Sequence, residues 1–142
     1  MGRRTTGEAL SPVLSWQDRR GAAQVERLRP HARLVRATTG LALSAHYGAS
    51  KLRWCLQHLD PVRKALADRR LACGPLASFL AFRMLEESPC LVDPATAVRT
   101  LLWDLDSGDW SQTLLELFQI PRRPLPDSVP SRHDYGHLQL SG

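Results

Sequence analysis

Long hydrophobic runs are missing from this sequence, and cysteine and aromatic residues are scarce. No apolar stretch approaches the ~20 residues that a membrane-spanning helix requires. Residues 1–6 also lack the apolar core of a secretory signal. We therefore expect a cytoplasmic protein with no membrane partner.

The cysteine pattern excludes several kinds of site. Only three cysteines occur, without Cys-x-x-Cys spacing, so neither a complete disulfide framework nor a tetrahedral metal site is indicated. We interpret Cys55, Cys73 and Cys90 as reduced, buried thiols. His133 and His137 have the spacing of a zinc pair on a helix, but Gly136 and the nearby prolines disfavour that helix, so we predict no metal site.

Negative charge is in deficit, and the resulting net charge of +5 raises the possibility of nucleic-acid binding. The basic residues are nevertheless scattered and often lie beside acids. No basic stripe interleaved with aromatic residues accompanies them, as single-stranded nucleic-acid sites require. We therefore expect a solvated charged surface and no nucleic-acid partner.

What is present is ordinary globular composition. The apolar fraction is 43% and the charged fraction 23%, and 142 residues suffice for one core. Short apolar runs alternate with amphipathic stretches, which predicts an α/β fold. We expect strands over residues 9–16 and 101–105, and a short strand and turn over residues 71–75. We expect helices over residues 18–28, 50–59, 62–70, 76–85 and 111–118, with shorter ones ending at Gly40 and starting at Asp93-Pro94, and a loop from Pro121 onward.

The helix predicted over residues 50–59 shows the clearest pattern. Leu52, Cys55, Leu56 and Leu59 occupy positions i, i+3, i+4 and i+7, which form one apolar stripe. Lys51 falls outside it. We interpret the stripe as part of the core and not as a cofactor site.

Several short motifs occur in an order that carries more information than any one of them. They are Trp16-Gln17-Asp18-Arg19-Arg20, Thr39-Gly40-Leu41, Asp93 with Arg99-Thr100, Gly108-Asp109-Trp110 and Ile120-Pro121. The order resembles the FGGY family of sugar kinases, which includes glycerol kinase and xylulokinase. The resemblance covers residues 7–137. It implies that residues 1–137 form part of an actin-like (ribonuclease H-like) domain and that residues 138–142 are a tail.

The resemblance also implies that much of a kinase is missing. Family members are several times longer, with two domains that close over a sugar and ATP. This chain corresponds to the later half of the first domain. The phosphate loop, the Gly-Asp-Gln catalytic-base segment and the nucleotide domain have no counterpart here. ATP and Mg are therefore expected for the full-length family, but their sites, and the catalytic residues, would lie outside this chain.

By this resemblance, Trp16 is the best candidate for contact with substrate, because the matching tryptophan lies against the carbon skeleton of the polyol. A tryptophan at a strand end is alternatively a core residue. Gln17 and Asp18 offer polar partners for hydroxyl groups. Asp18 is alternatively the cap of the helix that follows.

A second pocket element follows Gly40 and departs from the family pattern. Glycerol kinases carry Asp-Pro-Tyr-Phe where this chain has Ser44-Ala45-His46-Tyr47, so His46 stands in place of the polyol-contacting tyrosine. Glycerol is therefore a doubtful substrate. His46 can still donate or accept a hydrogen bond, or it is a plain loop histidine. If the resemblance is functional, we expect Trp16, Gln17, His46 and Tyr47 to converge on one pocket.

Two functions are consistent with these observations. The first is the sugar-binding part of a carbohydrate kinase, inactive alone, whose partners are a sugar or polyol and the missing kinase segments. The second is a noncatalytic remnant or accessory protein that binds a partner or itself through normally covered surface. The resemblance predicts a structural role for Asp93, Arg99 and Thr100 in either case.

Overall fold

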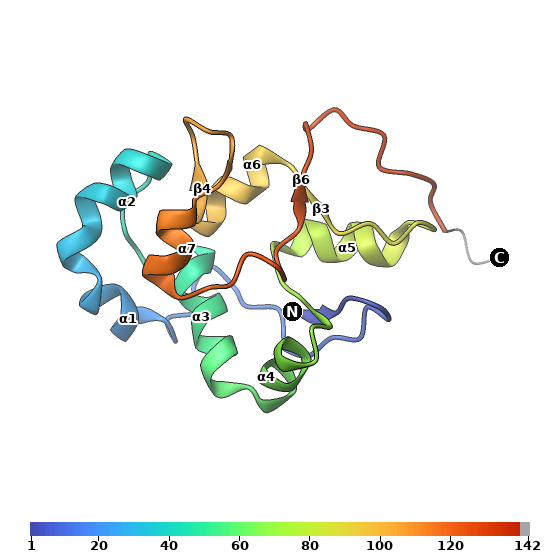
Figure 1. The fold of residues 1–142 in the computed structure, drawn as a ribbon, viewed down its shortest axis with the longest axis horizontal. Helices are drawn as coiled ribbons and strands as arrows, with labels where there is room; N and C mark the ends of the chain where they lie inside the picture. The colour runs from blue at the N-terminus through green and yellow to red at the C-terminus, as the bar shows by residue number, and fades with distance from the viewer. Residues whose placement is uncertain (140–142) are drawn as a thin grey trace.

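A computed structural model describes residues 1–139 of the chain. Helices and two-residue strands alternate along it and form the predicted mixed α/β fold (Figure 1). The helices are α1 (Ala22–Arg27), α2 (Ala32–Thr39), α3 (Gly48–His58), α4 (Asp60–Ala67), α5 (Leu76–Met84), α6 (Pro94–Ala97) and α7 (Gln112–Phe118), with 3₁₀ helices η1 (Arg29–His31) and η2 (Val98–Thr100). The strands are β1 (Gly2–Arg3), β2 (Leu71–Ala72), β3 (Leu91–Val92), β4 (Trp103–Asp104), β5 (Asp109–Trp110) and β6 (Asp127–Ser128).

The strands pair two by two within residues 1–139. β1 and β2 are antiparallel with Gly2 opposite Ala72, and β4 and β5 form an antiparallel hairpin with Trp103 opposite Trp110. β3 and β6 are parallel and lie beside α5 (Figure 1). In this part of the chain, no helix is long and apolar enough to cross a membrane.

Local capping explains where two helices begin. The Asp93 carboxylate accepts a hydrogen bond of 3.1 Å from the Thr96 backbone N–H, and Pro94 occupies the first turn of α6, as predicted. The Ser111 hydroxyl accepts from Leu114 N–H at 3.4 Å and caps α7. Gly40 ends α2 with a φ of 71°, a left-handed conformation that glycine adopts without strain.

The core lies between α2, α3, α4, α7 and the β4–β5 hairpin. Cys55 and Leu56 of the predicted α3 stripe are buried in it. Trp103 packs edge-on against Trp110 with ring centroids 5.7 Å apart, and the Trp110 indole donates to the Pro126 carbonyl at 2.9 Å. The apolar residues on the inward face of α7 are fully or almost fully buried: Leu114, Leu115 and Phe118.

The thiols fit the prediction in part. Cys55 and Cys73 are buried free thiols, whereas Cys90 is free but only half-buried. Complete burial raises the pKa of Cys73 to about 12, because the thiolate would lose its hydration. Cys73 is therefore a neutral packing residue at physiological pH.

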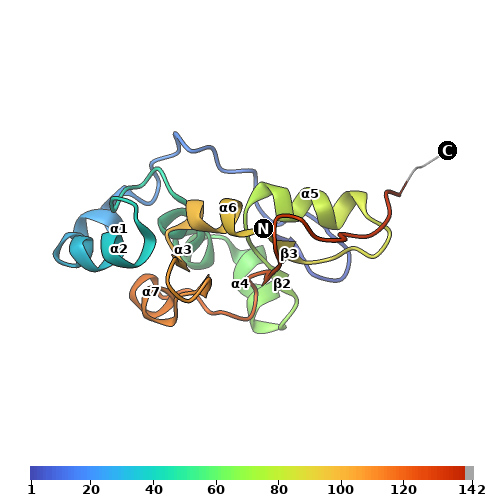
Figure 2. The same cartoon turned by 90° about the horizontal axis from the view of Figure 1, so that it is seen from above.

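The strand predicted over residues 9–16 is wrong. Ala9 forms an isolated bridge with Gly2, but the chain from Pro12 to Ser15 is extended coil. It runs along one side of the molecule between β1 and α1 (Figure 2). A strand requires a neighbour that accepts and donates its backbone hydrogen bonds, and within residues 1–139 no strand pairs with this segment. The apolar character of residues 12–15 was therefore not sufficient to form a strand without a partner.

Other boundaries also differ from the predictions. α1 starts at Ala22 and not at Asp18, because residues 16–21 form turns. Pro30 lies in η1, which leads directly into α2. The predicted loop after Pro121 contains β6. Leu80 of α5 is 45% exposed.

The end of the described region returns to α5. Leu138 forms an isolated bridge with Leu85, and the Gln139 N–H donates to the Met84 carbonyl at 2.7 Å. Most of the expected tail, residues 140–142, lies outside the described residues.

Candidate functional site

A cavity of about 500 Å³ opens between the extended segment that precedes α1, the start of α3, the start of α5 and the α6–η2 turn. This volume lies within the ~300–1,000 Å³ range of small-molecule sites. The lining combines apolar side chains with a few polar ones. They are Met1, Ala9, Ser11, Pro12, Val13, Leu14, Trp16, His46, Tyr47, Gly48, Lys51, Leu52, Cys55, Gly74, Pro75, Leu76, Phe79, Thr96, Arg99 and Thr100.

Trp16 reaches this cavity from the extended segment, and its side chain is open to solvent. The residue is 63% exposed, so it is not the alternative core tryptophan. Its ring centroid lies 5.2 Å from that of His46, and the His46 ring lies 5.0 Å from that of Tyr47. Trp16, His46 and Tyr47 thus lie together at the cavity, whereas Gln17, which the prediction included, is not among the lining residues.

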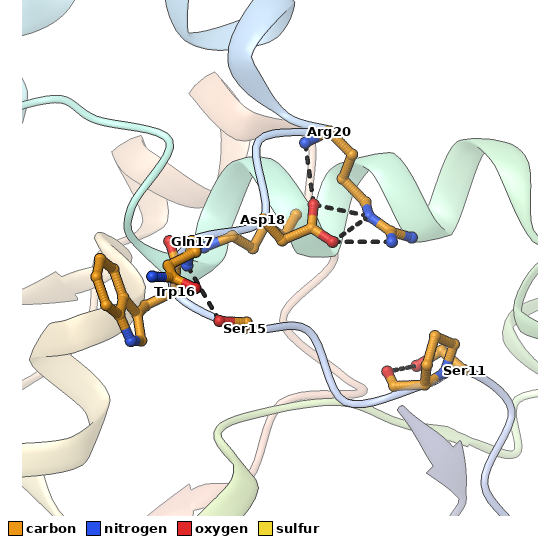
Figure 3. Close-up of polar contacts among 8 residues, drawn as sticks. Ser11, Ser15, Trp16, Gln17, Asp18 and Arg20 are labelled. Atoms are coloured by element: carbon orange, nitrogen blue, oxygen red, sulfur yellow. Dashed lines mark hydrogen bonds and ion pairs between the residues drawn. The ribbon is translucent and has the colours of Figure 1, made fainter.

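Gln17 and Asp18 do not join this lining. The Gln17 backbone N–H donates to the Ser15 hydroxyl at 3.2 Å. Asp18 forms a bidentate pair with Arg20, with distances of 2.9 and 3.0 Å from Nε to the two carboxylate oxygens. Figure 3 shows the Trp16 ring pointing away from this pair. The Arg20 guanidinium holds the pKa of Asp18 below its ordinary value.

Asp18 therefore satisfies neither of the two interpretations of the sequence. Gly21 is the N-cap residue of α1 and no side chain caps it, so Asp18 is not its cap. Its carboxylate also accepts the Arg20 backbone N–H at 3.0 Å. Asp18 thus fixes the turn that follows Trp16, and this turn orients the chain from which Trp16 projects.

Arg99 is a site residue whose position the sequence interpretation missed. Asp93 and Thr100 have the predicted structural roles, because Asp93 caps α6 and the Thr100 hydroxyl donates to the Ala97 carbonyl at 2.7 Å. Arg99 is instead exposed, and its guanidinium carbon lies 4.9 Å from the Tyr47 ring centroid. One terminal nitrogen is 3.3 Å from His46 Nε2.

The contact between Arg99 and His46 constrains the imidazole. Arginine only donates, so Nε2 accepts in this contact and carries no proton. The remaining N–H of a neutral ring is then on Nδ1. Arg99 therefore favours the neutral tautomer of His46 that carries its proton on Nδ1.

Lys51 is the second residue that the sequence interpretation missed. It is only 4% exposed, and its Nζ contacts the carbonyl oxygens of His46 at 2.7 Å, Trp16 at 3.4 Å and Tyr47 at 3.5 Å. Lys51 thus ties the segment that carries Trp16 to the turn that carries His46. A cation in the first turn of a helix interacts unfavourably with the helix dipole. This unfavourable position was the feature of the sequence that could have pointed to a special role for Lys51.

The lining supports binding more than catalysis. An aromatic face packs against C–H groups, while imidazole, hydroxyl and guanidinium groups bond to oxygen atoms. No aspartate or glutamate lines the cavity within residues 1–139, so this part of the chain offers no carboxylate as a general base. The same residues contain no cluster of three metal-binding side chains.

Comparisons with known proteins show the family to which the chain belongs. The family model of the FGGY carbohydrate kinase N-terminal domain matches residues 4–142. A glycerol kinase of Rhodopirellula baltica is 36% identical over 140 residues, which are 97% of this chain and 26% of that protein. A glycerol kinase of Aromatoleum aromaticum is 40% identical over 130 residues, which are 90% of this chain and 26% of that protein.

Solved structures show the same fold. A Plasmodium falciparum glycerol kinase solved with ADP superposes with a TM-score of 0.89 at 22% identity, covering 98% of this chain and 28% of that one. A gluconate kinase from Lactobacillus acidophilus gives a TM-score of 0.77 at 18% identity, covering 93% of this chain and 26% of that one. The chain therefore spans about a quarter of the length of these relatives. It belongs to the FGGY family of carbohydrate kinases and corresponds to part of the family's actin-like N-terminal domain.

Proposed function

We propose that this chain supplies the acceptor-binding part of a carbohydrate kinase that phosphorylates a hydroxyl group of a sugar or polyol. The observation that carries this proposal is the convergence of Trp16, His46 and Tyr47 at the cavity. The indole face packs on the carbon skeleton, and the His46 Nδ1–H and the neighbouring hydroxyl groups bond to the acceptor's oxygen atoms. Asp18 contributes indirectly by holding the turn after Trp16, and Gln17 lies in that turn.

In this proposal, the chain positions the acceptor and does not activate it. Phosphoryl transfer depends mainly on positioning and on stabilisation of charge at the transferred group. The cavity lining within the described residues contains no carboxylate to accept the hydroxyl proton. The general base must therefore come from other segments of a complete kinase, and we expect no turnover by this chain alone.

ATP and Mg do not fit the residues of this chain. Magnesium is usually held by carboxylates together with phosphate oxygens, whereas the charged side chains at the cavity are Lys51 and Arg99. The sequence also has no glycine-rich phosphate loop. If a complete kinase is assembled, its nucleotide site would come from the segments that lie outside this chain.

Reassembly of a kinase tests this function. Residues 4–139 would replace their counterpart in the Aromatoleum aromaticum glycerol kinase, and ATP-dependent phosphorylation of polyols would be measured. We expect activity, and we expect Trp16→Ala to raise the KM for the acceptor about tenfold or more while the KM for ATP changes little. Leu34→Ala is the control, because Leu34 is an exposed apolar residue of α2 outside the cavity lining.

The two variants separate a binding role from a folding role. Equal loss of acceptor and ATP binding in Trp16→Ala would indicate a folding defect and would contradict the proposal. The same would follow if Leu34→Ala weakened acceptor binding as much as Trp16→Ala did.

A second candidate is a noncatalytic interaction protein. One face of α5 presents Leu76, Leu80 and Met84 at 48%, 45% and 51% exposure, spaced four residues apart. An exposed apolar stripe of this kind favours association. Association that persists while the reassembled kinase is inactive would favour this candidate over the first.

A further inference from the structure

Lys51 is the one charged side chain that is buried within residues 1–139. No carboxylate in that part of the chain forms an ion pair with it. Burial of an ammonium group is costly unless hydrogen bonds replace its water, and here the carbonyl oxygens of Trp16, His46 and Tyr47 do so. Three acceptors match the three donors of an ammonium group. Lys51 therefore has no donor left for a ligand.

The Trp16 carbonyl belongs to a segment with few other attachments. Residues 12–17 form extended coil and a turn, and no strand of the described chain pairs with them. Their remaining hydrogen bonds stay local, between residues 11 and 18. Within residues 1–139, the bond from Lys51 is therefore the hydrogen bond that joins this segment to another element.

The other two bonds of Lys51 fix the opposite wall of the cavity. His46 and Tyr47 directly precede the first turn of α3, and Lys51 lies in that turn, so its side chain reaches back to their carbonyl groups. The Trp16 side chain is largely open to solvent, so burial does not hold it beside the His46 ring. The backbone attachment through Lys51 does.

We propose that Lys51 is a positioning residue of the acceptor site, which holds the backbone of Trp16 beside that of His46 and makes no contact with the ligand itself. The proposal rests on the proposed function, since the rings held in this way are those assigned to the acceptor. The contacts that carry it all lie within this chain. Binding then costs less entropy, because the ligand need not order an extended segment that is already fixed.

Replacing Lys51 by methionine tests the positioning directly, because methionine keeps an unbranched apolar stem without the ammonium donors. In the ¹⁵N- and ¹³C-labelled chain, we expect a nuclear Overhauser effect between the rings of Trp16 and His46, whose centroids are 5.2 Å apart. It should be lost in Lys51→Met. The effect between Trp103 and Trp110, 5.7 Å apart in the core, should remain and would show that the variant is folded.

The matched control is Lys64→Met, because Lys64 is the second of the chain's two lysines and is exposed on α4. It should leave both effects intact. The parent chain provides a measurement that does not depend on the folding of a variant. In reductive methylation with formaldehyde and a borohydride, Lys64 should be modified while Lys51 is protected. Equal rates at the two lysines would show that the Lys51 amine is free and would overturn the proposal.

The reassembled kinase separates positioning from a merely structural role. Lys51→Met should raise the KM for the acceptor about tenfold and change the KM for ATP little, because a displaced wall weakens acceptor binding alone. Lys64→Met should change neither. Similar increases in both KM values would indicate a folding defect and would overturn the proposal.

Two further outcomes separate this inference from the proposed function. Rings of Trp16 and His46 that stay together in a folded Lys51→Met chain would overturn the positioning role, and so would an unchanged KM for the acceptor. A reassembled kinase that is inactive, with a ring contact that still depends on Lys51, would count against the proposed function while supporting the attachment through Lys51.

Discussion

The Trp16 ring lies 5.2 Å from the His46 ring at a tilt of 48°, although one residue belongs to the extended segment before α1 and the other to the turn before α3. Lys51 explains this proximity, because its Nζ contacts the backbone carbonyl groups of both residues. A single buried cation thus joins the two walls of the site. Function at this cavity would therefore depend on a residue that itself needs no contact with the ligand.

The residue at position 46 should set the preference among acceptors. The family resemblance places a tyrosine of glycerol kinases here, so His46→Tyr should restore a phenolic hydroxyl toward the acceptor. In the reassembled kinase, we expect the KM for glycerol to fall about tenfold, as one hydrogen bond of ~1–1.5 kcal/mol provides. His58→Tyr is the control, because His58 stacks on Trp54 outside the cavity lining. An unchanged or higher KM for glycerol in His46→Tyr would contradict the role of this position.

The cap of α6 should stabilise the segment that carries Arg99. Asp93→Ala removes the acceptor for Thr96 N–H and for the Ser131 hydroxyl, which lies 2.8 Å away. We expect a loss of about 0.5–2 kcal/mol in the free energy of unfolding, measured by urea denaturation. Asp106→Ala, at an exposed turn position, should cost much less. Equal losses in the two variants would show that the cap contributes nothing.

The same cap predicts a dependence on pH. Hydrogen bonds from Thr96 and Ser131 lower the pKa of Asp93 in the folded state. A lowered pKa stabilises the fold above the ordinary pKa of an aspartate, and this contribution disappears as the pH falls through the folded value. The difference in stability between the parent chain and Asp93→Ala should therefore shrink in acid.

The contact between Glu87 and His137 should stabilise the described end of the chain within a defined pH window. His137 Nδ1 lies 2.8 Å from the carboxylate, which lowers the pKa of Glu87 to about 2 and raises the pKa of His137. The Glu87 contribution is lost as the pH falls toward that value, and the His137 contribution is lost as the pH rises through its raised pKa.

The contribution should therefore be greatest between the ordinary pKa values of glutamate and histidine, about 4.3 and 6.5. Glu87→Gln should lower the melting temperature at about pH 5.5 more than at about pH 8. Glu86→Gln is a suitable control, because the Glu86 side chain forms no ion pair within residues 1–139. A decrease of the same size at both pH values would contradict the pair.

The exposed stripe of α5 predicts self-association. Leu76, Leu80 and Met84 leave apolar surface in water, and replacing all three by glutamine should reduce association because less apolar area is available for burial. Sedimentation velocity at increasing concentration measures this. The matched control changes Arg83 and Ala77 on α5 to glutamine. A parent chain that stays a compact monomer at high concentration would contradict the prediction.

The sequence predicted well those features that depend on neighbours in the chain. The cap of α6, the end of α2 at Gly40 and the stripe of α3 all follow from residues within one or two turns. Residues 9–16 show the limit, since a strand depends on a partner elsewhere. β6 was missed for the same reason, because its pairing with β3 joins distant segments.

The candidate site was predicted through resemblance more than through physical pattern. Trp16, His46 and Tyr47 were found by their motifs, and their convergence could be stated in advance. Lys51 and Arg99 were missed because helical periodicity places a charged residue off the apolar stripe and says nothing of a cavity formed by other segments. The ion pair between Asp18 and Arg20 was missed because charged side chains this close in sequence can each pair with several neighbouring groups.

The indole signal of Trp16 gives the most direct test of the acceptor site. The chain has four tryptophans, of which Trp103 and Trp110 are only 2% and 7% exposed in the core. In a ¹⁵N–¹H spectrum of the chain, titrated with a polyol or sugar and assigned by single Trp→Phe substitutions, we predict that the Trp16 indole signal shifts and saturates while those of Trp103 and Trp110 stay in place. A Trp16 signal that does not move with any of these ligands, or that moves only together with the core tryptophans, would contradict the account.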